Sequence, residues 1–134
     1  MRPETHLEAF EERKETIIKW AVEVRGIEHS QRIIGDNASR AIAELLSAFL
    51  HKNHKVEEGF QLNHAWFKSE KVFQRLPEFE KKMEIVPKMI ALEKACEKLS
   101  YGSPKSVKDI GQALSLFKQL EEMLKALNPK EGPQ

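Results

Sequence analysis

The sequence predicts an all-α protein, a compact bundle of about five helices, from three observations. Apolar residues recur at steps of three and four along most of the chain, which is the spacing of one face of an α-helix. No segment alternates apolar and polar residues in the manner of a strand. The 134 residues are 40% hydrophobic and 32% charged, the balance of one soluble domain that is long enough to bury its own core.

The first two helices should occupy the N-terminal half of the chain. One is expected from about Thr5 to Arg25, because Gly26 can adopt the left-handed conformation that ends many helices. The second should span about Ile27–Asn53 as one continuous helix, although Gly35 inside it costs about 1 kcal/mol relative to alanine. Apolar residues on two flanks of the second helix predict contacts with more than one neighbour. The expected inner face of the first helix consists of Leu7, Phe10, Ile17, Ala21 and Val24.

A polar connection and a shorter helix should follow. Residues His51–Asn63 are expected to form the connection, with Phe60 and Leu62 packing back onto the core. The third helix should cover about His64–Arg75. It should end there because Pro77 disfavours helical backbone in the residue before it.

The last two helices have the longest apolar patterns. The fourth should span about Glu78–Ser100, with Pro77 at its start and a bend near Pro87. The fifth should begin after a capping serine, either Ser103 or Ser106. The expected inner face of the fourth helix consists of Phe79, Met83, Val86, Ile90 and Leu99, and that of the fifth of Val107, Ile110, Leu114, Phe117, Leu120, Leu124 and Leu127.

Composition and charge narrow the classes of function. We expect a single domain over residues 1–127 and a disordered tail over 128–134. With 22 Lys and Arg against 21 Asp and Glu, nucleic acid could bind only at a local patch. The single cysteine, Cys96, excludes an internal disulfide and fits a reducing, cytoplasmic location as a buried, inert thiol. Neither a signal peptide nor an apolar run of the roughly 20 residues that span a bilayer is present.

A polar stripe on the second helix is the main candidate binding surface. It consists of Asp36, Arg40, Glu44, Ser47 and His51, whose steps of four, four, three and four keep the side chains on one line. The guanidinium of Arg40 suits a phosphate or a carboxylate, so Arg40 and His51 could line a groove for a ligand. The alternative is that the alternating charges at positions 36, 40 and 44 only stabilise their own helix.

Aromatic and basic residues also gather around position 70. This combination superficially resembles a platform for nucleic acid, but the aromatic residues have core spacing and Glu70 offsets the lysines, so we expect core packing. The residues are Trp66, Phe67, Lys68, Lys71, Phe73 and Arg75.

Neither a metal site nor a catalytic site can be derived from the spacing of residues. His51 and His54, with His64 as a further donor, are weak candidates for metal ligands, because no acidic partner has a defined position and a helix C-terminus by itself favours histidine. No glycine-rich phosphate loop, GxSxG or HExxH motif occurs. We therefore expect no cofactor, no metal and no catalytic residues.

Two stretches resemble the HEPN superfamily of small helical bundles. They are DNASRAIAELLSAFLHK, residues 36–52, and ACEKLSYGSPKSVKDIGQALSLFKQLEEML, residues 95–124. The resemblance implies an up-and-down bundle that forms a homodimer and is often found beside a nucleotidyltransferase partner. Catalytic members carry an arginine and, further along the chain, a histidine, with four to six residues between the two. None of the arginines here is followed by a histidine with that number of residues in between.

The resemblance therefore implies a noncatalytic interaction module. Its ligand would be a nucleotide, an RNA or a nucleotidyltransferase-type partner protein, bound through Asp36, Arg40, Glu44, Ser47 and His51. The alternative is an unconventional or degenerate RNase that uses Arg40 and His51 across a groove.

Overall fold

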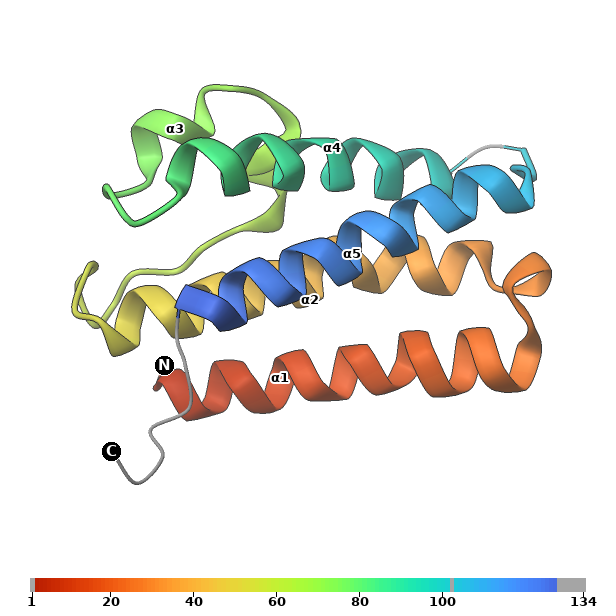
Figure 1. Ribbon diagram of the computed structural model, residues 1–134, viewed down its shortest axis with the longest axis horizontal. Helices are drawn as coiled ribbons and strands as arrows, with labels where there is room; N and C mark the ends of the chain where they lie inside the picture. The colour runs from red at the N-terminus through yellow and green to blue at the C-terminus, as the bar shows by residue number, and fades with distance from the viewer. Residues whose placement is uncertain (1, 102, 128–134) are drawn as a thin grey trace.

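Four long helical segments lie side by side in the computed structural model, which describes residues 2–101 and 103–127 (Figure 1). The prediction of an all-α bundle is confirmed, since no strand occurs in these two ranges. Central α2 packs against α1, α4 and α5, as its two apolar flanks predict. The elements are α1 (Pro3–Glu15), the π-helix η1 (Thr16–Arg25), the 3₁₀ turn η2 (Ile27–His29), α2 (Gln31–Lys52), the 3₁₀ helix η3 (His64–Lys68), α3 (Val72–Arg75), α4 (Lys82–Ser100) and α5 (Val107–Leu127).

The first helix ends where the sequence predicts, but its second half is a π-helix. Gly26 follows η1 with φ +89°, a conformation that few residues other than glycine adopt. Ile17 and Ala21 are buried as expected, whereas Val24 is 62% exposed. Each i→i+5 turn of η1 holds more residues than an α-turn, so seven steps from Ile17 no longer return to the same face. The placement of Val24 in the core is thus wrong.

The second helix begins four residues later than predicted. Residues 27–29 form the 3₁₀ turn η2, and Ser30 separates it from α2 with φ −127°. The buried Ser30 hydroxyl lies 2.7 Å from the carbonyl oxygen of Ala21 and 2.9 Å from that of Gly26, and its one proton is shared between these two acceptors. These bonds hold the corner between η1 and α2. From Gln31 onward α2 is one continuous helix through Gly35, as predicted.

At Gly35, α2 lies very close to the end of α4. A Cβ atom at Gly35 would lie 2.8 Å from Leu99 Cβ and from the Ser100 amide nitrogen. We therefore expect Gly35→Ala to lower the free energy of unfolding by about 1–3 kcal/mol. Gly111→Ala in α5 is the matched control, because a Cβ there meets nothing within 4 Å, and it should raise stability by about 0.5–1 kcal/mol. Urea titrations that gave both variants the same sign would contradict this close approach.

The third helix is interrupted in its middle, contrary to the prediction of one helix over His64–Arg75. Residues 64–68 form η3, extended Ser69 interrupts the helix, and α3 covers only residues 72–75. Phe67 and Val72 are each 1% exposed. In a continuous helix these two side chains would point about 140° apart, and the interruption allows both to enter the core. Phe60 and Leu62 of the preceding connection pack against the core, as expected.

The fourth helix starts at Lys82, four residues after the predicted start at Glu78. Lys81 precedes it in the left-handed conformation, with φ +61°, so Pro77 does not lie at the helix start. Met83, which was expected in the core, is 73% exposed, whereas Val86, Ile90 and Leu99 are buried, as predicted. α4 continues as one helix across Pro87.

The fifth helix agrees best with the sequence. The Ser106 hydroxyl accepts a hydrogen bond from the Asp109 amide at 3.1 Å, which makes Ser106 the capping serine. Val107, at the first position, is 52% exposed, contrary to the expected pattern. The remaining inner positions are buried or half-buried, as predicted: Ile110, Leu114, Phe117, Leu120, Leu124 and Leu127.

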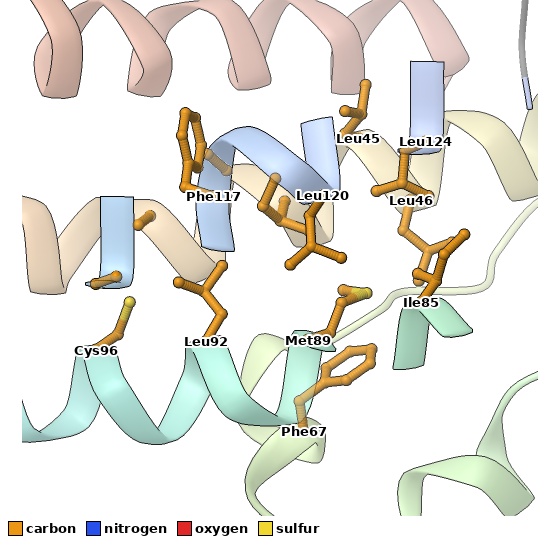
Figure 2. Packing of buried hydrophobic residues seen from close by; sticks show 14 of the residues in the cluster. Leu45, Leu46, Phe67, Ile85, Met89, Leu92, Cys96, Phe117, Leu120 and Leu124 are labelled. Atoms are coloured by element: carbon orange, nitrogen blue, oxygen red, sulfur yellow. The ribbon is translucent and has the colours of Figure 1, made fainter. Parts of the chain in front are cut away.

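One hydrophobic core joins the described helices. Figure 2 shows side chains of α2, α4 and α5 pointing toward one another, with Phe67 of η3 packed against them. The residues labelled in Figure 2 are Leu45, Leu46, Phe67, Ile85, Met89, Leu92, Cys96, Phe117, Leu120 and Leu124.

Two further predictions concern a membrane and the tail. Among the described residues, no helix is both long enough and apolar enough to span a membrane. The predicted tail, residues 128–134, lies outside the described residues.

Candidate functional site

The predicted stripe on α2 does not form one exposed surface. Asp36 is exposed at one end and accepts a hydrogen bond from the Ser100 hydroxyl at 2.6 Å. Arg40 is exposed and Glu44 half-buried. Ser47 and His51 are buried, at 3% and 9% exposure. The stripe is therefore open to a ligand from Asp36 to Glu44 and closed at Ser47 and His51.

Arg40 and Glu44 lie in an open groove of about 430 Å³, which we call the Arg40 groove. One wall comes from α1 and α2, and the other from the connection before η3 and from η3 itself. The lining residues are Arg13, Arg40, Ala43, Glu44, Gln61, Leu62, Asn63, His64 and Trp66.

The charges in the Arg40 groove favour an anion. Arg40 has neither a hydrogen bond nor an ion pair among the described residues. Arg13 donates to the neutral Asn37 side chain at 3.1 Å, so its charge is not compensated by that contact. The carboxylate of Glu44 lies 2.9 Å from Nδ1 of His6. Two guanidinium groups thus face the groove against one carboxylate that already has a partner.

His64 links the Arg40 groove to a buried carboxylate on α4. Its Nδ1 lies 2.9 Å from Oε1 of Glu93, which is 3% exposed. Asn63 positions the start of η3, because its side chain accepts a hydrogen bond from the Ala65 amide at 2.8 Å. The pairing of His64 with Glu93 was not predicted. The available signal was a carboxylate three residues after Ile90, on the apolar face of the fourth helix.

Trp66 forms part of the groove wall and is held by two ring contacts. The guanidinium of Arg75 lies 4.9 Å from its ring centroid, and the Phe60 ring lies 5.9 Å away at 73°. The expectation of core packing for this aromatic cluster is met at Phe67, which is buried, while Trp66 and Phe73 are half-buried.

His51 faces a different hollow from Arg40. Its ring stacks on that of His6, with centroids 5.4 Å apart, and its Nε2 lies 3.1 Å from the Phe60 carbonyl oxygen. It lines a hollow of about 560 Å³ together with Arg2, Pro3, Lys52, His54, Val56 and Glu58. The structure therefore does not bring Arg40 and His51 to one groove.

The remaining sequence candidates do not assemble a metal site. His54 is exposed in a left-handed turn, with φ +55°. Across residues 2–101 and 103–127, no group of three or more His, Cys, Asp or Glu side chains is arranged to hold a metal ion. Cys96 is buried, as predicted, and burial raises the pKa of its thiol to about 11. A thiol with that pKa is almost entirely protonated at neutral pH and is a poor nucleophile.

Comparison with known proteins adds no relative. No protein-family model, no curated protein and no solved structure matches this chain. The resemblance of residues 36–52 and 95–124 to the HEPN superfamily therefore remains a prediction from the sequence.

Proposed function

We propose that this protein is a noncatalytic, HEPN-like binding module that holds a nucleotide or an RNA segment in the Arg40 groove. The observation that supports this most directly is the exposed guanidinium of Arg40, which has no partner among the described residues. An unpaired guanidinium at the wall of a groove can form two parallel hydrogen bonds to a phosphate.

The other groove residues supply the contacts that a nucleotide needs. Arg13 adds a second positive charge, and the side-chain amides of Gln61 and Asn63 can donate to and accept from base edges. Trp66 adds an aromatic surface, on which bases commonly pack. Together these groups can contact both the phosphate and the base of a nucleotide.

Replacing Arg40 with alanine should weaken the binding of a short single-stranded RNA about tenfold or more. A hydrogen bond to a charged group contributes about 1.5–3 kcal/mol, and 1.4 kcal/mol corresponds to a factor of ten in affinity. Fluorescence anisotropy of a labelled oligonucleotide at low salt measures the effect. The thermal unfolding of Arg40→Ala should be unchanged, because the side chain is exposed and unpaired.

Arg32→Ala is the matched control, since Arg32 is an exposed arginine on the same helix that lines a different hollow. Equal losses in both variants would mean nonspecific attraction and would contradict the proposal. Absence of RNA and nucleotide binding by the unmodified protein would also contradict it and would turn attention to a nucleotidyltransferase-type partner. Cleavage of the RNA in the presence of a chelator would favour the degenerate RNase instead.

A further inference from the structure

The pair of His64 and Glu93 is more deeply buried than a surface ion pair, with side-chain exposures of 26% and 4%. Glu93 lies on the inner face of α4, beside a narrow gap lined by Ser39, Ile42, Phe67, Met89 and Leu92. A buried carboxylate is strongly disfavoured unless a hydrogen-bond donor satisfies it. The Nδ1–H of His64, 2.9 Å from Oε1, supplies that donor.

This hydrogen bond determines what His64 can offer to a ligand. With Nδ1 donating to Glu93, Nε2 is the nitrogen left for a group in the Arg40 groove. In the neutral ring Nε2 can only accept a hydrogen bond, whereas in the imidazolium it donates one. An anion can therefore be bound through Nε2 only by the protonated ring.

The charged groups around His64 come from three helices and from η3. Glu93 lies on α4, while Arg13 of α1 and Arg40 of α2 line the groove together with His64. A phosphate bound between the guanidinium groups and His64 adds negative charge beside the ring and so favours protonation. The other nearby charges are paired: Glu44 with His6, and Lys68 of η3 with Glu97 of α4.

We infer that the Arg40 groove binds the phosphate group of its ligand and that His64 takes up a proton on binding, held in place by the buried carboxylate of Glu93. This inference rests on the proposed function and names the ligand chemistry, a phosphate ester. In this proposal the guanidinium of Arg40 is positively charged with or without the ligand, whereas the His64 ring gains its positive charge by protonation when the ligand binds. Binding therefore weakens as the pH rises above the range in which an imidazole is protonated.

Calorimetric titration with adenosine 5′-monophosphate at pH 6.5, in two buffers of different ionisation enthalpy, measures the proton uptake. We expect a buffer-dependent enthalpy that corresponds to uptake of up to one proton, and affinity about tenfold lower at pH 8 than at pH 6.

Further probes are needed because the phosphate of a phosphomonoester itself titrates near pH 6. A dinucleoside phosphodiester is therefore the second probe, because its phosphate does not titrate in this range. Inorganic phosphate and adenosine complete the set and separate the phosphate from the nucleoside.

His64→Gln should remove the proton uptake for the phosphodiester, and His54→Gln, at an exposed histidine outside the groove, should not. If His64→Gln fails to fold, Glu93→Gln tests the same point, since without the carboxylate the uptake at pH 6.5 should fall. Proton uptake unchanged in His64→Gln would overturn this inference while leaving the proposed function intact, provided that Arg40→Ala still weakens binding. Adenosine binding as tightly as its monophosphate would overturn the assignment of phosphate, and no binding of any probe would contradict both proposals.

Discussion

Replacing Lys82 with alanine should lower the free energy of unfolding by about 2–4 kcal/mol, an unusually large effect for a lysine. The Lys82 side chain is only 6% exposed. Its Nζ donates to the carbonyl oxygens of Phe73 and Leu76, both at 3.1 Å. These carbonyls lie at the end of α3, where no helical amide is available for them. Alanine would leave both without their donor, at about 1–3 kcal/mol for an acceptor that water cannot reach; the bond to Leu76 is buried and the bond to Phe73 is partly buried.

Two control variants isolate the role of the carbonyls. Glu78→Gln removes the ion pair to Lys82 but should cost less than about 1 kcal/mol, because the Glu78 side chain is 92% exposed. Lys94→Ala removes an exposed lysine from the same helix and should have little effect. Guanidinium titrations followed by circular dichroism give the three values. A loss for Lys82→Ala no larger than that for Lys94→Ala would show that the buried ammonium does not stabilise this part of the fold.

Replacing Phe117 with alanine should have the largest effect, a loss of about 3–5 kcal/mol. Phe117 of α5 has no exposed surface, and its ring stacks on that of Phe10 in α1 with centroids 6.2 Å apart. The substitution would open a cavity between the first and last helices of the bundle. Scanning calorimetry should show a large decrease in the melting temperature.

The Phe10–Phe117 contact can be measured separately with a double-mutant cycle. The two single alanine variants and the double variant should be non-additive by about 0.5–1.5 kcal/mol, the contribution of a ring pair beyond its buried area. Val107→Ala, at the exposed start of α5, should change stability by less than about 1 kcal/mol. Strict additivity of the two phenylalanine variants would contradict a direct contact between the rings.

Short stretches of the sequence correctly predicted where a helix is capped and where a helix continues. Ser106 caps α5 as its spacing from Asp109 predicts, and the apolar period of α2 runs through Gly35 without a break. The period failed where the backbone departs from α-geometry. Val24 is turned outward by the π-helix, and Met83 is exposed in the first turn of α4, directly after the left-handed Lys81. Neither departure leaves a pattern in the hydropathy of the chain.

The candidate site was predicted less completely than the fold, because its parts come from distant segments. Arg40 was identified from the stripe, but the wall opposite it belongs to residues 61–66, which have no helical period. Glu93 and Lys82 occupy inner positions of α4 because partners reach them from His64 and from the end of α3. Such contacts depend on how the chain returns on itself, which spacing along one helix cannot indicate.

The position of Trp66 in the groove wall, beneath the guanidinium of Arg75, provides the protein with an optical reporter of its own site. The chain has two tryptophans, and the other, Trp20, lies half-exposed on η1. In a Trp20→Phe variant the whole indole emission would come from the site. Occupancy could then be followed by quenching, without a dye attached to either component.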